Sequence, residues 1–466
     1  MTRVVLFPMT DGMWGVQMDS PFSYNDDMKK YLLYFLLGVH LFVILYFWLM
    51  SSGFLAFTSF AEFFLAFGRL FGLLAVTCVL LQFLLIGRSR WIEELFGLDK
   101  LSRVHHYNGY LAFTFILLHP LFITFGYASS SKTNAVQQFI TLISTNRNIL
   151  FAFCAVLLFI TIIFASVYII RKRLKYETWY FVHLLNYAAI SLAFLHQLEL
   201  GSDFLANPVF KWYWYALYTA VAVNHIFFRF LRQTWLFYKH RFTVQKVEKE
   251  TSDTTSVYIG GKNLPDFKID AGQFLIYRFL NKKLWWQAHP FSVSYYPSSE
   301  FIRLTPKQVG DYTSELPTIQ KGTKVLIDGP FGIFTGKLAV RPKFLFIAGG
   351  VGITPIFAMI QKLVLKQKDI FLLYSNKTER EVIFKKEFDT WARQGLIRLR
   401  YIMTQDKKFK GEQGRLDKEK IQRIVPDLKK REIYLCGPVP FMEAVKQALM
   451  ELGVEKKFIH YEKFSL

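Results

Sequence analysis

The sequence has few cysteines, and their spacing gives neither a metal site nor a disulfide framework. Cys78, Cys154 and Cys436 are the only three in 466 residues, and no two of them form a CxxC pair. This excludes a disulfide-rich secreted scaffold and a zinc-finger type of site. The first 27 residues lack an apolar stretch followed by a small-residue cleavage site, so we expect no secretory signal peptide.

Acidic residues are also scarce, at 35 against 57 lysines and arginines. Residues 239–466 hold 40 of those cations and 24 of the acids, so they carry +16 of the net +22. A basic region beside a membrane is attracted to anionic lipid and to phosphorylated cofactors. No nucleic-acid-binding module is recognisable, so we expect no nucleic-acid partner.

Apolar residues are abundant, at 52% of the chain. Lysine and arginine cluster in alternate connections between the apolar segments, which puts both termini in the cytoplasm by the positive-inside rule. We therefore expect an integral protein of a plasma or inner membrane, in contact with lipid. Six segments are long enough to span the bilayer: residues 31–50, 60–87, 104–126, 148–170, 178–200 and 212–231.

Two of these segments carry paired histidines. His105 and His119 are fourteen residues apart, which on an ideal helix is about 21 Å along the axis and within about 40° of one face. His183 and His196 are thirteen apart, with a similar rise but an offset of about 140°, so a π-bulge or bend is expected there. Both helices run outward, so the first members share the inner level and the second members the outer level. Two histidines from facing helices at one depth are the axial ligands of a haem iron.

Two alternatives concern this region. His106 is thirteen residues before His119 and can replace His105 as a ligand, but His105 gives the better shared face. Arg69, in FGRLFG, is either a snorkelling side chain or a counter-charge for haem propionates, with glycines that permit close helix approach. We expect the second role. The isolated histidines His40, His225 and His240 are interpreted as structural.

After about residue 240 the pattern changes to short runs typical of an antiparallel barrel. The run HPFS (His289, Pro290, Phe291 and Ser292) lies on a predicted strand, and Gly310 and Thr313 follow in VGDYT before a short helix. Backbone amides at a helix start suit a pyrophosphate, while Phe291 and Ser292 can contact a flavin ring. DGPFG, residues 328–332, is expected to be a tight turn leaving the barrel.

From about residue 340 strands alternate with helices, which predicts a doubly wound parallel sheet. In FLFIAGGVGITPI an apolar strand leads to a glycine cluster and then to a helix. Small residues there let the backbone approach a pyrophosphate, Thr354 is expected to cap the helix, and Pro355 to lie in its first turn. The expected dinucleotide contacts in this loop are Gly349, Gly350, Gly352, Thr354 and Pro355.

Three further positions complete the expected site. Lys377 or Arg380, after the next strand, can meet a 2′-phosphate, or either can be a solvated charge, so NADH and NADPH stay equally open. Cys436 and Gly437 lie at a strand's carboxyl end, where the nicotinamide is expected. No partner for a thiol nucleophile is evident at Cys436. Phe464 is expected to stack on the flavin, or else to be a frayed tail.

As a set these residues resemble the ferric reductase / NADPH oxidase family, over residues 28–466. The resemblance implies a six-helix di-haem domain, a flavin-binding barrel and a nucleotide-binding α/β domain, which we place at 28–238, 239–338 and 339–466 after an N-terminal segment 1–27. The family motif often reads HPFT, from which Ser292 departs while keeping the hydroxyl. The resemblance also implies ligation of the inner haem by His105 and His183 and of the outer haem by His119 and His196, propionate contact by Arg69, FAD contact by His289, Phe291, Ser292 and Thr313, and flavin cover by Phe464.

The expected activity is transmembrane electron transfer from cytosolic NAD(P)H, through FAD and two b-type haems, to an extracytoplasmic acceptor. That acceptor is oxygen, giving superoxide, or ferric iron, and no protein partner is required. There are two alternative hypotheses. In the first, the bundle is a haem-free anchor for a flavoreductase. In the second, the chain passes electrons to a separate partner protein.

Overall fold

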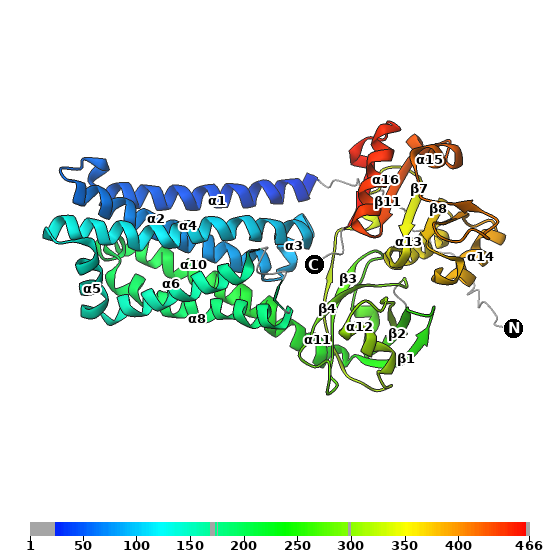
Figure 1. Cartoon of the computed structure of the whole chain (residues 1–466), viewed down its shortest axis with the longest axis horizontal. Coiled ribbons are helices and arrows are strands. Elements are labelled where there is room, and N and C mark those ends of the chain that lie inside the picture. The colour runs from blue at the N-terminus through cyan, green and yellow to red at the C-terminus, as the bar shows by residue number, and fades with distance from the viewer. Residues whose placement is uncertain (1–23, 168–172, 175, 297–299, 463–466) are drawn as a thin grey trace.

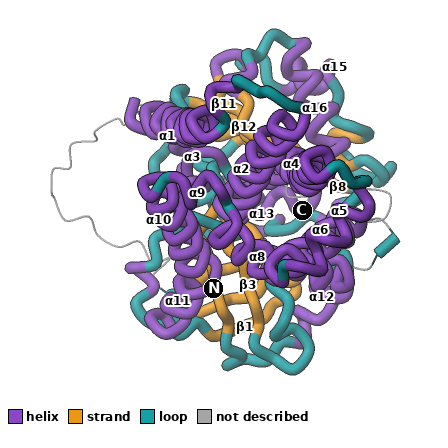
Figure 2. Tube along the Cα trace, turned by 90° about the vertical axis from the view of Figure 1, so that its left-hand side faces the viewer, coloured by secondary structure: helices purple, strands orange, loops and turns teal. Residues whose placement is uncertain are grey.

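The structure is a computed structural model that describes residues 24–167, 173–174, 176–296 and 300–462. A bundle of long helices occupies one end, and the strands with helices α12 (Asp311–Glu315) to α16 (Val439–Glu451) occupy the other (Figure 1). Figure 2, which views the molecule from the far end of the bundle, shows the helices in front of the strands. The predicted fold class is confirmed: a helical membrane bundle, then an antiparallel β domain, then a parallel α/β domain.

Six long helices form the bundle, and five of them are long and apolar enough to cross a membrane. The sixth, α10, has only 19 residues and carries Lys211, Asn224 and His225 among its aromatic side chains. Short helices lie between or after the long ones: α3 (Arg90–Phe96), α5 (Ala135–Thr145), α9 (Ser202–Ala206) and α11 (Arg232–His240). The long helices are α1 (Tyr24–Ser51), α2 (Phe60–Ile86), α4 (Leu98–Ser131), α6 (Arg147–Ser166), α8 (Tyr176–Leu200) and α10 (Pro208–Ile226).

The antiparallel β domain consists of two three-stranded sheets, in the orders β1-β2-β5 and β4-β3-β6. Single bridges between Thr243 and Lys324 and between Val293 and Leu304 join the two sheets along both edges, which makes a barrel around an apolar core. The strands are β1 (Thr243–Lys249), β2 (Thr255–Gly260), β3 (Phe274–Phe279), β4 (His289–Ser292), β5 (Ile302–Leu304) and β6 (Val325–Phe331), with helix α12 (Asp311–Glu315) before β6.

The last domain has a six-stranded parallel sheet in the order β10-β9-β8-β7-β11-β12. The chain moves outward from β7 to β10 and then returns to place β11 beside β7, so the topological switch point lies between these two strands. The strands are β7 (Lys343–Gly349), β8 (Asp369–Asn376), β9 (Arg398–Met403), β10 (Glu412–Gln413), β11 (Arg431–Cys436) and β12 (Ile459–Tyr461), and the helices are α13 (Ile353–Leu365), α14 (Lys385–Arg393), α15 (Lys418–Ile424) and α16 (Val439–Glu451).

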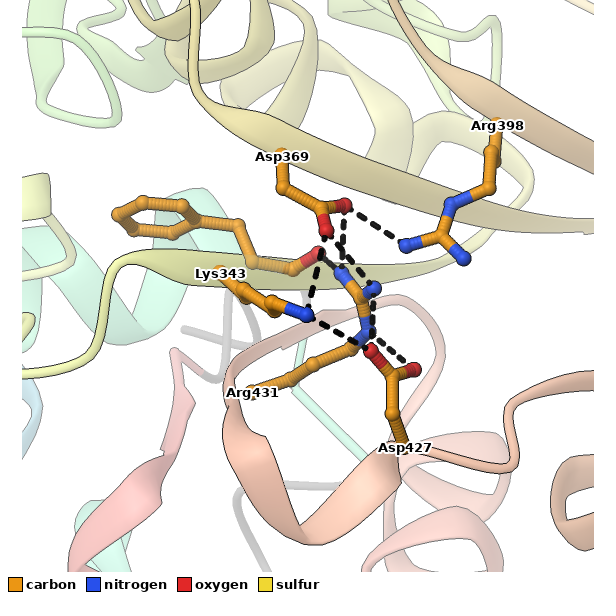
Figure 3. A network of polar contacts seen from close by, with 6 residues as sticks. Lys343, Asp369, Arg398, Asp427 and Arg431 are labelled. Carbon is orange, nitrogen blue, oxygen red and sulfur yellow. Dashed lines mark hydrogen bonds and ion pairs between the residues drawn. The ribbon is translucent and has the colours of Figure 1, made fainter.

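A charged network ties the amino ends of the strands of this sheet together (Figure 3). Arg431 is fully buried and donates to Asp369 on β8 and to Asp427, while Lys343 and Arg398 complete the cluster. Ligands of open parallel sheets bind at the opposite, carboxyl ends of the strands. The network is therefore a structural element and not part of the nucleotide site.

The structure corrects two predictions of local structure. DGPFG is not a turn, because β6 continues to Phe331 and pairs with β3. Thr354 does not cap α13, because the helix begins at Ile353 with Gly352 as its N-cap. The Thr354 hydroxyl instead donates to the Val351 carbonyl, at 3.0 Å, from within the first turn.

Candidate haem, flavin and nucleotide sites

The four predicted histidines meet in two pairs, each with one member on α4 and one on α8. The ring centres of His105 and His183 are 6.1 Å apart, and those of His119 and His196 are also 6.1 Å apart. Helix α4 packs along α2, and α8 packs along α6, so the imidazoles bridge two helix pairs. The structure thus places both pairs as the sequence predicts, although their role as ligands is not tested by this geometry alone.

The spacing of the rings fits a single metal ion between them. An imidazole nitrogen lies about 2.0–2.1 Å from the metal it binds, so two imidazoles on opposite sides of one ion have centres about 6 Å apart. Three of these side chains also have a buried Nδ1 without a partner: His105, His183 and His196. Buried polar atoms without partners are costly, which is consistent with a group that binds here. The described residues contain no group of three or more His, Cys, Asp or Glu side chains that could hold a metal ion. A haem iron held by two histidines does not need such a group.

Glycines on α2 hold His119 in place. The His119 Nδ1 lies 2.8 Å from the Gly68 carbonyl, which is the backbone hydrogen bond that typically orients a ligating imidazole. A Cβ on Gly72 would lie 2.9 Å from the same Nδ1, and one on Gly68 would lie 2.9 Å from Ile123. The small residues on both sides of Arg69 therefore allow the close approach of α2 and α4.

The neighbouring histidine differs from His105 in its surroundings. His106 is exposed and packs its ring edge-on against Tyr107 and Tyr110 on its own helix. His105 instead faces His183, while its backbone carbonyl accepts a hydrogen bond from Gln82. The structure thus favours His105 as the member of the inner pair.

Helix α8 remains a regular α-helix through both of its histidines. The expected π-bulge is therefore wrong for this helix, and the π-helical turn lies at Phe227–Leu231, between α10 and α11. Both histidines of this helix nevertheless meet a histidine of α4, with ring centres 6.1 Å apart in each pair.

Arg69 has a partner that the sequence did not indicate. Its Nε lies 3.3 Å from Asp203 Oδ1 on α9, and its Nη2 donates to Ser52 at 3.0 Å. Asp203 is buried and also accepts from Ser51. Arg69 is thus charge-compensated by the protein, and its contact with propionates stays a prediction.

The three histidines that we interpreted as structural, His40, His225 and His240, each have a hydrogen-bond partner. His40 Nδ1 lies 2.6 Å from the Tyr213 hydroxyl, and its Nε2 lies 3.1 Å from Thr77. His225 Nε2 lies 2.9 Å from the Tyr187 hydroxyl. His240 Nδ1 lies 3.0 Å from the Lys262 carbonyl at the start of the barrel.

The HPFS run forms β4, at the edge of its sheet. His289, Pro290 and Phe291 are half-buried, and Ser292 is buried. The His289 ring lies 3.9 Å from that of Tyr312 on α12, and burial lowers the pKa of His289, so its imidazole is neutral at neutral pH. Tyr312 joins this aromatic group without having been predicted, although its place within VGDYT was the available signal.

Thr313, within α12, stabilises the loop that precedes this helix. Its hydroxyl accepts from the amides of Val309 at 2.9 Å and Gly310 at 3.1 Å, and donates to the Gly310 carbonyl. Gly310 is the N-cap of this helix, and a Cβ there would meet no other atom within 4 Å. The segment is thus preformed, and its surface beside Gly310 is open.

The predicted nucleotide residues converge at the switch point between β7 and β11. Gly349 ends β7, and a Cβ on Gly437 would lie 3.1 Å from the Gly349 Cα. A Cβ on Gly352 would lie 2.5 Å from the Cys436 carbonyl oxygen, so only glycine fits there. Gly350 adopts a φ of +54°, which glycine tolerates best. Pro355 follows in the first turn of α13.

Cys436 is fully buried at the end of β11. Burial, with a smaller effect of Glu462, raises the pKa of its thiol well above the usual range. The thiol is therefore protonated at neutral pH, which excludes a thiolate nucleophile. Glu462 itself is buried next to the end of the described chain and was not predicted. Phe464 lies outside the described residues, so its stacking on a flavin stays a prediction.

Lys377 and Arg380 lie at the carboxyl end of β8 and are exposed. The backbone after β9 runs beside them, since Gln405 N donates to the Lys377 carbonyl at 2.9 Å. The structure places both cations at the sheet edge where an adenosine would lie, and their role stays a prediction.

Comparison with known proteins gives three family matches in order along the chain. The ferric reductase like transmembrane component matches residues 71–194, an FAD-binding domain matches 240–335, and an oxidoreductase NAD-binding domain matches 346–447.

Individual proteins match this chain at low sequence identity. A glycine betaine monooxygenase reductase subunit of Chromohalobacter salexigens is 28% identical over 247 residues, which are 50% of this chain and 66% of the relative. The Bacillus subtilis flavohemoprotein is 26% identical over 243 residues, 49% of this chain and 60% of the relative. The chain thus spans less than two thirds of the length of these relatives. The flavohem-like FAD/NAD binding domain of nitric oxide dioxygenase from Vibrio cholerae is 24% identical, with a TM-score of 0.43, and covers 47% of this chain and 96% of that one.

The ferric reductase match coincides with the helices that carry the histidine pairs, the FAD-binding match with the barrel, and the NAD-binding match with the parallel sheet. The chain therefore carries, in order, a ferric reductase like transmembrane component, an FAD-binding domain and an NAD-binding domain, which is the domain architecture of the ferric reductase / NADPH oxidase family.

Proposed function

We propose that this protein takes electrons from NAD(P)H on the side of its reductase domains and delivers them to an acceptor on the opposite side of the membrane. The observation that carries the proposal is the matching separation of 6.1 Å in two histidine pairs stacked along the same two helices. The basic connections on the reductase side support a cytosolic location for these domains and for both termini.

The residues present suit the cofactors that this function needs. His105 and His183 would hold one b-type haem, and His119 and His196 the other, with Arg69 near the outer propionates. FAD would contact His289, Pro290, Phe291, Ser292, Gly310 and Thr313, and NAD(P)H would lie over the glycine loop and Gly437. When bound, the flavin accepts a hydride and the haem irons carry single electrons.

The proposed ligands also limit how the acceptor is reduced. A haem iron held by two of these histidines would have no open position for a further ligand, so the acceptor would be reduced by contact and not by direct binding to the metal. A small oxidant such as oxygen, giving superoxide, or a ferric chelate meets this condition.

Sealed vesicles with the reductase domains facing outward test the proposal. Addition of NAD(P)H should reduce a ferric chelate trapped inside, measured as ferrous iron, or reduce oxygen to superoxide that is detected by a membrane-impermeant probe trapped inside. Superoxide without ferrous iron would identify an oxidase, and the reverse a ferric reductase. Reduction only of acceptors outside the vesicles would contradict transmembrane transfer. Reduced haem without turnover of either acceptor would instead favour a separate partner protein.

A further inference from the structure

The connection between β3 and β4, residues 280–288, displays an exposed tryptophan next to the membrane helices. Trp285 is 59% exposed, while the preceding Leu284 is buried in the barrel core. The Asn281 side chain accepts from the amides of Lys283 and Leu284, and Trp285 N donates to the Asn281 carbonyl. We call residues 280–288 the β3–β4 loop. Its ordered turn fixes the outward direction of the indole.

The β3–β4 loop lies beside the inner end of α8. The ring of Trp286 stacks on that of Phe181, with centres 6.3 Å apart and an interplanar angle of 27°. Phe181 is in the second turn of α8 and is itself 58% exposed, in a helix whose membrane-spanning part begins at Glu177. The loop is therefore at the depth where the bundle leaves the hydrocarbon layer, which is also the depth of lipid headgroups.

The loop has the composition of a headgroup-binding segment. Lys282 and Lys283 are exposed, and residues 280–288 contain no acidic side chain. Lys283 forms an ion pair with Glu315 at 2.8 Å, so Lys282, three residues before Trp285, is the cation of this loop that we assign to lipid phosphates. Tryptophan is enriched at membrane–water interfaces, and lysines near the surface are attracted to anionic lipid.

A second exposed group lies on α11, the helix that leads from the bundle into the barrel. Trp235 and Tyr238 are exposed, and Lys239 lies 5.1 Å from the centre of the Trp235 ring. The opposite face of α11 packs on β6 through buried Arg232 and Leu236. The β3–β4 loop and α11 thus both present aromatic and basic side chains outward at the membrane surface.

We propose that the β3–β4 loop binds the anionic phospholipid headgroups of the leaflet on the reductase side, with Trp285 in the interface and Lys282 on the phosphates. The barrel is then fixed to the membrane at a point two residues from His183 along α8. The inference rests on the membrane placement of the bundle and not on haem binding.

Photocrosslinking of the full-length protein tests this surface. The protein is placed in lipid nanodiscs of phosphatidylcholine that contain phosphatidylglycerol with a photoreactive headgroup, and the labelled peptides are identified by mass spectrometry. We expect label on residues 280–288, and a several-fold loss of that label in the double variant Lys282→Gln/Trp285→Gln. The control Lys246→Gln/Lys249→Gln removes two positive charges, one more than the test variant, from exposed positions on β1 of the same barrel and should leave the label unchanged.

Three results would overturn the proposal. These are label on α8 without label on the loop, equal loss of label in both double variants, and crosslinks from the loop to a second protein. Retained reduction of a soluble dye by NAD(P)H shows that each variant is folded. Because the label requires no electron transfer, a protein without haem but with a labelled loop would refute the proposed function and leave this inference standing.

Discussion

Arg232 Nη1 lies 2.9 Å from Asp328 Oδ1, in an ion pair that joins the helix after the bundle to the last strand of the barrel. Water is excluded from this contact, since the two residues are 7% and 2% exposed. Arg88, in the connection after α2, donates to the other carboxylate oxygen at 3.2 Å. One carboxylate thus fixes two membrane-side arginines to the flavin barrel.

Asp328→Asn should destabilise the protein by about 3–5 kcal/mol, because it removes the carboxylate that pairs with the buried Arg232 and the half-buried Arg88. Thermal unfolding of the detergent-purified protein measures this loss. Asp253→Asn is the control, since Asp253 forms an ion pair with Lys307 at a more exposed position and should cost at most about 1 kcal/mol. Equal losses in the two variants would contradict a structural role for the buried pair.

Glu93→Gln should remove a pH dependence of stability. Glu93 on α3 accepts from the Gly332 amide at 2.7 Å, and burial raises its pKa from 4.5 to about 7. The folded state therefore favours the protonated acid, and its stabilising contribution, about 3 kcal/mol, is complete below pH 4.5 and is lost as the pH rises through 7. Unfolding temperatures from pH 4.5 to 8 should fall for the wild type relative to Glu93→Gln. Glu94→Gln, at an exposed neighbour, should keep the slope of the wild type.

His105→Leu should remove one of two haems, whereas His106→Leu should keep both. The reason is that His105 faces His183, while His106 is exposed and contacts only its own helix among the described ring contacts. Haem content per chain is the measurement. Loss of haem in His106→Leu with retention in His105→Leu would exchange the two assignments.

Gly352→Ala should weaken both the fold of the nucleotide domain and NAD(P)H binding. An added Cβ would lie 2.5 Å from the Cys436 carbonyl oxygen, so β11 and the glycine loop would have to separate. Gly336→Ala is the control, because a Cβ there meets nothing within 4 Å. Titration of flavin reduction with NAD(P)H should show a higher half-saturating concentration in the first variant only. An unchanged value for Gly352→Ala would refute the close contact.

Cys436 should resist alkylation at pH 8 in the folded protein, because burial raises the pKa of its thiol and keeps it protonated. Mass spectrometry after iodoacetamide treatment tests this, with protein unfolded in urea as the reactive control. Rapid labelling of the native protein would show that the end of β11 is accessible.

The features that the sequence predicted well depend on local pattern. Apolar length located the bundle helices, alternation located the barrel strands, and glycines between a strand and a helix located the β7–α13 loop. The histidine pairs could also be predicted locally, because the prediction required only the depth of each histidine along its helix. Their 6.1 Å separations confirm the predicted juxtaposition, although not the ligand role.

The features that it missed depend on contacts distant in sequence. Three such contacts join segments that no local pattern connects. Asp203 pairs with Arg69, Asp328 pairs with Arg88 and Arg232, and the Glu93 carboxylate accepts from the Gly332 amide. The prediction that Thr354 caps α13 was wrong for a local reason. The Thr354 hydroxyl donates to the Val351 carbonyl one turn back, and a glycine serves as the N-cap.

The most direct test of the proposed function is the haem content of the purified protein, from its optical spectrum as the pyridine complex. We expect two b-type haems per chain, and one in either His119→Leu or His196→Leu, with flavin reduction by NAD(P)H unchanged in both. A wild-type protein that shows only the flavin spectrum, with no iron-porphyrin recovered, would contradict the proposed function.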